Sequence, residues 1–264
     1  MALAPRLVAE QLWLGYGGRA AVREVNLAVQ PGDIVALIGP NGSGKSTLLK
    51  GLGRLLPPLR GVVLLDGRAI ETVPRRQVAR QLAILPQNPE SPADLTVGEL
   101  VALGRWPRRR GWLALNARQD PAVARALAWT ALTALAHRPL ATLSGGERQR
   151  AWIAMALAQT PTTLLLDEPT THLDLGHQWE VMELLECLNR QHGATIVLAL
   201  HDLQQAAWLA HQLMVLKGGY MIAQGPPRDV LTPELIADAF GMKVRILWDA
   251  ETGRLLCIPL GRSR

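Results

Sequence analysis

Short apolar runs separated by glycine, proline and polar residues recur along the chain and predict β-strands. Residues 7–30 alternate apolar and polar positions around a turn at 15–18, which predicts two half-buried strands. Residues 33–38 are almost wholly apolar, as expected of a strand buried on both faces of a sheet. Similar runs at 83–85, 163–166 and 195–200, with helical stretches between the later ones, predict a parallel sheet covered by helices.

The middle and the end of the chain show other patterns. Residues 86–160 have helix-like periodicity and almost no strand-like run, and residues 122–136 are rich in Ala and Leu, which favour helix. Two apolar runs flank a Lys217-Gly218-Gly219 turn and predict a hairpin, and Pro233 fits the first turn of a helix that reaches residue 239. The pattern predicts a helical insertion within an α/β chain.

The composition is that of an ordinary globular protein. With 264 residues, of which 48% are hydrophobic and 19% charged, the chain can bury a sizeable core, which excludes disorder and collagen. Its two cysteines, Cys187 and Cys257, are far apart and predict reduced, inert thiols rather than a disulfide framework or a metal site. We expect no signal peptide in residues 1–10, and no apolar run approaches the roughly 18 residues of a membrane span.

The charge balance is basic, with 28 Lys and Arg against 22 Asp and Glu and a net charge of +6. The densest run contains Arg105, Arg108, Arg109 and Arg110, with Trp106 and Trp112 close by in the sequence. A smaller group contains Arg75, Arg76 and Arg80. Such runs are usually exposed faces, so a solvated surface or a contact with protein or lipid headgroups is favoured over nucleic acid.

A phosphate-binding loop follows the buried strand at 33–38. Residues 39–47 match the pattern G-x-x-x-x-G-K-[ST] and precede a helix that begins Thr47-Leu48-Leu49. Glycines let successive backbone N–H groups line one concavity, and the helix N-terminus adds partial positive charge, so the loop can hold a polyphosphate. Lys45 would supply charge to the outer phosphates, and the hydroxyl of Ser46 would bind Mg²⁺. The loop reads Gly39, Pro40, Asn41, Gly42, Ser43, Gly44, Lys45, Ser46 and Thr47.

Two carboxylates end the apolar run at 163–166. Asp167 and Glu168 should therefore lie at the carboxyl edge of the sheet, where open α/β sheets bind ligands. Asp167 is placed to hold the Mg²⁺ shell, and Glu168 to act as base or to orient a water behind the terminal phosphate.

A third motif reads Leu143-Ser144-Gly145-Gly146-Glu147 and opens an apolar helix. Ser144 and Glu147 form a capping box, and the bare backbone N–H groups at Gly145 and Gly146 suit a second phosphate contact. With this motif the chain resembles the ATP-binding-cassette (ABC) ATPases, whose signature has this residue sequence. The resemblance extends from about residue 7 to 244.

The resemblance implies further site residues. Tyr16 would stack on adenine, Gln87 would touch Mg²⁺ and the attacking water, Asp174 belongs to the D-loop, and His201 would contact the terminal phosphate and Glu168. It also implies a head-to-tail dimer, in which Ser144, Gly145 and Gly146 of one copy close on the ATP held by Lys45 of the other. The fold implied is an α/β P-loop NTPase with a RecA-like parallel core, an antiparallel β-subdomain and an inserted helical subdomain.

The resemblance also sets the expected organisation. Residues 1–264 form one ABC ATPase domain, in which 1–86 and 160–264 make the β-subdomain and the core. Residues 87–159 make the helical subdomain with the signature, and 217–264 make a C-terminal hairpin and helix extension.

Within the family, the Thr171-His172-Leu173-Asp174 wording resembles the importers of iron–siderophore complexes, haem and cobalamin. The siderophore branch is the expected one. The expected partners are permease subunits, a second copy, and indirectly a periplasmic or extracytoplasmic binding protein, with the chain peripheral at the cytoplasmic face of the inner membrane. Haem or cobalamin import, export, a soluble ATPase acting on nucleic acid or ribosomes, and a non-hydrolysing module remain alternatives.

Overall fold

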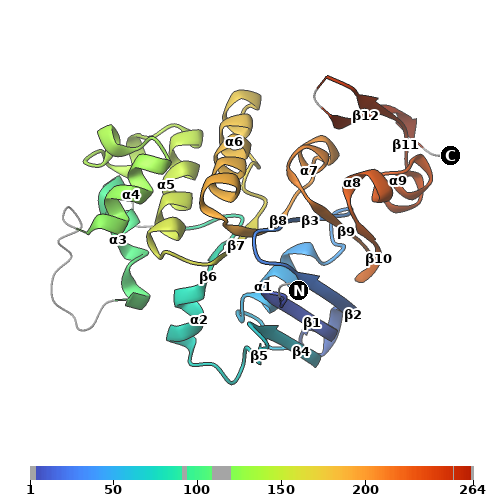
Figure 1. Cartoon of the computed structure of the whole chain (residues 1–264), viewed down its shortest axis with the longest axis horizontal. Helices are drawn as coiled ribbons and strands as arrows, with labels where there is room; N and C mark the ends of the chain where they lie inside the picture. Colours follow the sequence, from blue (N-terminus) through green and yellow to red (C-terminus); the bar gives the residue numbers. More distant parts are fainter. Residues whose placement is uncertain (1–3, 91–93, 109–119, 252, 263–264) are drawn as a thin grey trace. The chain divides into compact units, whose positions relative to one another are not determined.

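The computed structural model describes residues 4–90, 94–108, 120–251 and 253–262, and these form two compact units. The first unit contains residues 1–72 and 193–264, and the second contains residues 73–192. Each unit is described on its own (Figure 1). The predicted boundaries of a helical subdomain at 87–159 stay a prediction.

The first unit contains an antiparallel sheet and a mainly parallel one. The antiparallel sheet has the order β2-β1-β4-β5, and in the other sheet β3 lies between β8 and β9, parallel to both, while β10 pairs antiparallel with β9. All five residues of β3 and of β8 are buried, as the apolar runs predict. The strands are β1 (Leu7–Tyr16), β2 (Arg19–Val29), β3 (Ile34–Ile38), β4 (Arg60–Leu65), β5 (Arg68–Ala69), β8 (Thr195–Ala199), β9 (Gln212–Lys217) and β10 (Tyr220–Gly225).

Four helices and a second hairpin complete the first unit. The helices are α1 (Lys45–Leu52), α7 (Leu203–Leu209), α8 (Pro227–Val230) and α9 (Pro233–Phe240). The predicted β9–β10 hairpin is confirmed, and its two-residue turn places Gly218 and Gly219 at positive φ, where glycine is favoured. The helix predicted from Pro233 is also confirmed and ends at Gly241, which is left-handed.

The residue pattern predicted only the hairpin around Gly218 and not the second one, which follows α9. Strand β11 (Met242–Asp249) pairs antiparallel with β12 (Arg254–Arg262). The side chain of Gln204 on α7 holds β12, because its Nε2 donates to Leu255 O at 2.9 Å and its Oε1 accepts from Cys257 N at 3.0 Å. A side chain of α7 thus takes the hydrogen-bonding position of a neighbouring strand.

The second unit is mainly helical, as predicted for this part of the chain. Strands β6 (Leu82–Leu85) and β7 (Thr163–Asp167) pair parallel. The described helices are α2 (Arg75–Gln81), α3 (Val97–Leu103), η1 (Trp106–Arg108), α4 (Pro121–Trp129), η3 (Thr133–Leu135), η4 (Leu140–Thr142), α5 (Gly145–Ala158) and α6 (Leu175–His192). No described helix in either unit is long and apolar enough to cross a membrane.

The helix predicted over residues 122–136 is too long. Helix α4 ends at Trp129, where the buried Thr130 hydroxyl donates to Ala126 O at 2.9 Å. Ala131 then turns left-handed at φ 54°, and Leu132 N donates to Leu127 O at 2.8 Å. This is a Schellman-type ending with alanine in the usual glycine position, so the sequence carries no glycine signal for the stop.

Candidate functional site

The phosphate-binding loop joins β3 to α1 in the first unit. Gly39, Gly42 and Gly44 all have positive φ, at 149°, 76° and 105°. A β-carbon at Gly39 would overlap Leu216 O, and one at Gly44 would come within 2.9 Å of Ala21 O. The loop therefore needs glycine at these positions both for its backbone conformation and for its close packing on β2 and β9.

Lys45 and Ser43 face inward on this loop. Lys45 is buried, and its Nζ donates to Gly39 O at 2.7 Å and to Pro40 O at 3.1 Å. The hydroxyl of Ser43 is buried and makes no hydrogen bond to the described residues. A buried ammonium and an orphaned hydroxyl on one loop, with glycine N–H groups at the start of a helix, fit a polyphosphate.

Two other predicted residues belong to the first unit. Tyr16 ends β1 beside the Gly17-Gly18 turn and is 52% exposed, so its ring is available for stacking. His201 is exposed and follows β8, and the next residue, Asp202, caps α7 by accepting from Gln204 N and Gln205 N. The approach of His201 to Glu168 stays a prediction, because Glu168 lies in the second unit.

The two predicted carboxylates end β7 in the second unit. Asp167 and Glu168 are both buried, and Glu168 has a left-handed backbone at φ 53°. Glu168 Oε2 accepts hydrogen bonds from Gln87 Nε2 and, at 3.2 Å, from Thr171 Oγ1. The structure thus brings Gln87 and Glu168 together, and it adds Thr171, which sequence reasoning missed. A non-glycine residue at positive φ stores about 1–3 kcal/mol of strain, which is typical of functional positions.

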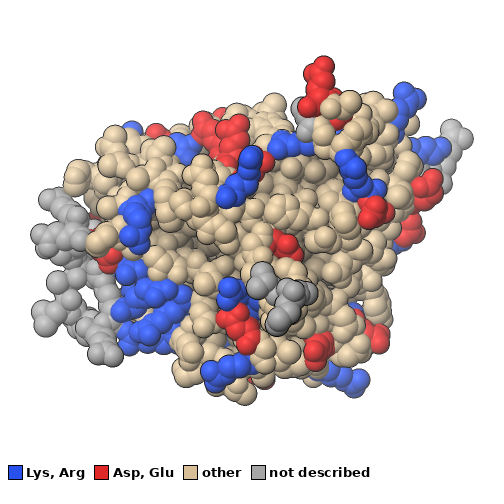
Figure 2. Space-filling view, in the orientation of Figure 1, with Lys and Arg blue, Asp and Glu red and all other residues tan. Residues whose placement is uncertain are grey.

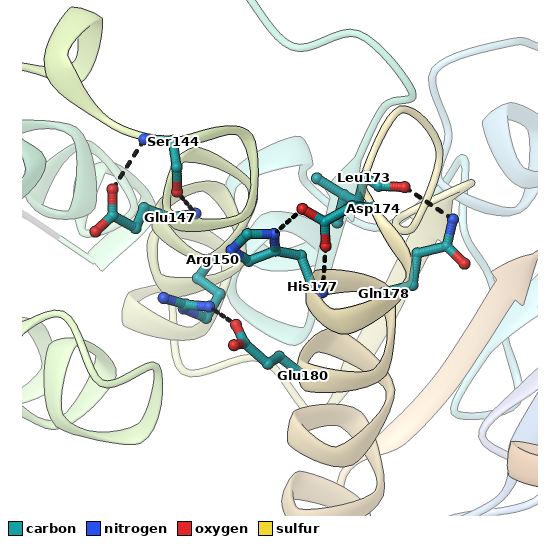
Figure 3. A network of polar contacts seen from close by, with 8 residues as sticks. All are labelled: Ser144, Glu147, Arg150, Leu173, Asp174, His177, Gln178 and Glu180. Atoms are coloured by element: carbon teal, nitrogen blue, oxygen red, sulfur yellow. Dashed lines mark hydrogen bonds and ion pairs between the residues drawn. The ribbon is translucent and has the colours of Figure 1, made fainter.

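The signature residues begin α5 (Figure 3). Ser144 and Glu147 form the predicted capping box: Glu147 N donates to Ser144 Oγ at 3.2 Å, and Ser144 N donates to Glu147 Oε2 at 2.8 Å. The hydrogen bond from the Ser144 backbone is the main reason why the pKa of Glu147 lies below its ordinary value. A charged capping carboxylate therefore holds the N-terminus of α5.

Asp174 and His177 form a second polar pair at the start of α6, which Figure 3 shows beside the signature. Asp174 Oδ1 accepts from His177 N at 2.9 Å, and Asp174 Oδ2 lies 2.7 Å from His177 Nδ1. These two hydrogen bonds, the backbone one first, lower the pKa of the Asp174 carboxyl. The sequence analysis gave His177 no role, although an Asp-x-x-His spacing at a helix start was the available signal. The described residues contain no cluster of three metal-binding side chains.

The basic run falls partly outside the described residues. Arg109, Arg110 and Trp112 lie there, whereas Arg105 forms an ion pair with Asp120 at 2.8 Å. Arg108 lies on η1 beside Arg76 and Arg80 of α2. The two basic groups of the sequence thus meet on one surface.

Similarity to known proteins covers almost the whole chain. Residues 22–171 match the ABC transporter family model. The chain is 45% identical over 252 residues to the iron(3+)-hydroxamate import ATP-binding protein FhuC of Bacillus subtilis (96% of this chain, 94% of the relative). It is 46% identical over 258 residues to the ferric enterobactin transport ATP-binding protein FepC of Escherichia coli (98% and 95%). The hemin import ATP-binding protein HmuV of Gloeobacter violaceus is 42% identical over 266 residues (97% and 95%).

Solved structures agree with this assignment. A metal-chelate type ABC transporter in an inward-facing conformation matches with a TM-score of 0.84 at 29% identity, covering 98% of both chains. A dimeric bacterial ABC transporter cassette matches with a TM-score of 0.74 at 29% identity, covering 84% of this chain and 99% of the other. The chain therefore belongs to the ABC transporter family, as one of its ATP-binding, ATP-hydrolysing subunits.

Proposed function

We propose that this chain hydrolyses ATP with Mg²⁺ to drive the import of an iron chelate of the siderophore class. The observation that carries the proposal is the near full-length identity of 45% and 46% to ATP-binding proteins named for iron hydroxamate and enterobactin. A haem chelate is the second candidate, supported by the 42% identity to the hemin import protein.

In this proposal the phosphate-binding loop holds the triphosphate of ATP. Gly39, residues 41–44 and Thr47 offer backbone N–H groups. Lys45 exchanges its carbonyl partners for phosphate oxygens, which are stronger partners for an ammonium. Tyr16 stacks on the adenine ring. Bound Mg²⁺ would neutralise the phosphate charge, and Ser46, Asp167 and Gln87 are the residues proposed to hold it.

Glu168 is proposed as the residue that orients and deprotonates the attacking water. Hydrogen bonds from Gln87 and Thr171 to the same carboxylate oxygen hold the side chain of Glu168 in place. His201 is proposed to contact the terminal phosphate. Because Gln87 touches Glu168, a displacement of Gln87 would change the position of the base, which offers a route from a membrane partner to hydrolysis.

The proposed working form is a head-to-tail dimer bound to a permease. Ser144, Gly145 and Gly146 would contact the ATP held by the second copy, together with Asp174. The permease and an extracytoplasmic binding protein would carry the selectivity for the chelate, and the chain would lie peripherally at the inner face of the cell membrane. Binding of two ATP molecules closes the dimer, and hydrolysis releases it.

Uptake of labelled ferric siderophore in cells whose chromosomal copy carries Lys45→Ala tests the proposal. Lys50→Ala is the matched control, since Lys50 lies on the same helix outside the loop. We expect Lys45→Ala alone to abolish ferric-siderophore uptake, while uptake of labelled haem and cobalamin is unchanged. Selective loss of haem or cobalamin uptake would move the chain to a sister group, and unchanged uptake of all three would refute the import role.

A further inference from the structure

Four arginines on the second unit lie together on one surface, which we call the arginine surface: Arg75, Arg76, Arg80 and Arg108. Arg76 Nε and Arg80 Nε each donate to Pro107 O at 2.9 Å. Arg108 in turn donates to Arg80 O at 2.9 Å. These bonds bring the guanidinium groups of α2 and η1 close to each other, and Figure 2 shows a continuous blue area there.

The positive charge of this surface is not balanced locally. Among the described residues, the four arginines form no ion pair with a carboxylate, whereas the neighbouring Arg105 pairs with Asp120. Burial, followed by the charges of Arg105 and Arg80, lowers the pKa of Arg108 from its ordinary value. The arginines therefore repel one another, and an anion placed between them would be attracted to several charges at once.

Donors for such an anion are also present. The hydrogen bonds of Arg76 and Arg80 use Nε, and their terminal nitrogens make no hydrogen bond to the described residues. Arg75 and Arg76 are exposed, and Arg80 is half-buried. A guanidinium with free terminal N–H groups matches the oxygens of a phosphodiester in a bidentate manner.

An exposed tryptophan lies beside these charges. Trp106 is the first residue of η1 and is 69% exposed, the second highest value among the large hydrophobic residues that the structure describes. Tryptophan is enriched at the headgroup level of membranes, where its ring lies among the lipids and its N–H stays hydrated. Nucleic-acid surfaces also combine arginine with aromatic residues, but a family of membrane transporter subunits works beside a lipid surface.

We propose that the arginine surface and Trp106 bind the anionic phospholipid headgroups of the membrane. This contact goes beyond the ATPase function, and it does not require ATP or the permease. Each basic residue near an anionic membrane contributes about fivefold in affinity, so two arginines contribute roughly 25-fold.

Vesicle flotation of the full chain tests the proposal. The vesicles contain phosphatidylcholine with or without about one third phosphatidylglycerol, without nucleotide and at low salt. We expect the parent chain to bind the anionic vesicles and not the neutral ones, and the Arg76→Gln/Arg80→Gln variant to bind roughly 25-fold more weakly. The matched control, Arg68→Gln/Arg190→Gln, loses the same charge elsewhere and should bind like the parent.

A charge-conserving variant separates electrostatics from packing. Arg76→Lys/Arg80→Lys removes the Nε bonds to Pro107 but keeps both charges, so its binding should stay within about threefold of the parent. Equal binding by the parent and the Gln variant, or equal loss in the Lys and Gln variants, would overturn the proposal. Preference of the parent for duplex DNA over anionic vesicles at the same salt would also overturn it. ATP hydrolysis by all variants, measured separately, tests the proposed enzymatic function on its own.

Discussion

The imidazole ring of His177 occupies the space into which a side chain on Gly146 would extend. A β-carbon built on Gly146 would overlap Cδ2 and Cγ of that ring, whereas one on Gly145 would meet only Leu173 Cδ2, at an ordinary 3.6 Å. The second glycine of the signature therefore lets the start of α5 lie against the start of α6, in addition to any phosphate contact.

Replacing this glycine should destabilise the protein. Gly146→Ala forces His177 to move and to weaken its bonds with Asp174, which costs about 1–3 kcal/mol by overpacking. For a chain of this size, thermal unfolding followed by circular dichroism should show a midpoint lower by about 2–4 °C per kcal/mol. Gly145→Ala should cost much less, and His177→Ala should restore part of the loss in the Gly146→Ala background. Equal midpoints for the two glycine variants would contradict the contact.

Glu168→Gln should separate ATP binding from hydrolysis. The amide keeps the size of the side chain but cannot accept a proton, so phosphate release should fall at least 100-fold while nucleotide binding persists and the ATP-bound dimer becomes stable. Phosphate release measures hydrolysis, nucleotide titration measures binding, and size-exclusion chromatography with ATP measures the dimer. Glu183→Gln, an exposed change on α6, is the control. Hydrolysis at the parent rate in Glu168→Gln would show that another residue acts as the base.

The end of α4 offers a stabilising substitution. Ala131 is exposed and left-handed, so Ala131→Gly relieves backbone strain and should stabilise the protein by up to about 1 kcal/mol. Ala128→Gly, exposed within the same helix, should destabilise by about 1 kcal/mol. Urea unfolding of the two variants measures the free energy of unfolding, which should rise in Ala131→Gly and fall in Ala128→Gly. Destabilisation by both would show that residue 131 is not left-handed in solution.

The two cysteines should differ in reactivity. Burial, and secondarily the charge of Asp202, raises the pKa of Cys257 from its ordinary 9.0 to about 11, whereas Cys187 is exposed. At pH 9 the folded Cys257 thus has roughly one hundredth of its groups as thiolate, and iodoacetamide should label it far more slowly than it does in urea. A Cys187→Ser variant isolates the signal. Labelling of Cys257 at the same rate with and without urea would contradict the shift.

The same shift determines how this thiol affects stability with pH. Because the folded pKa is the higher one, the folded chain binds the proton more tightly than the unfolded chain between about pH 9 and 11. Its contribution to stability is therefore complete below about pH 9 and is lost as the pH rises towards 11.

The sequence predicted those parts of the fold whose signal is local. Strands β3, β7 and β8 are buried throughout, so their apolar runs stand out, and the loop of residues 39–47 contains its own glycines. The C-terminal hairpin gave a weaker signal, because β11 and β12 are largely exposed and their alternation is broken by Leu247 next to Trp248. The end of α4 was missed because alanine occupies a position that glycine usually marks.

At the candidate site, too, the features with a local sequence signal were predicted and the others were not. The carboxylate pair at a strand end named Glu168, the family resemblance named Gln87, and the structure joins the two. The contact of Gly146 with His177, and the meeting of Arg76 and Arg80 with Arg108, depend on how separate helices pack. A single sequence carries no local signal for such contacts.

The hydrogen bonds between Gln204 and β12 have a consequence for the association of molecules at high protein concentration. A hairpin with an open outer edge can pair with the same edge of another molecule and so start aggregation. The Gln204 amide occupies one donor and one acceptor of that edge, at Cys257 N and Leu255 O, and so blocks the first two bonds of an added strand. One helical side chain therefore occupies part of this strand edge without a further strand.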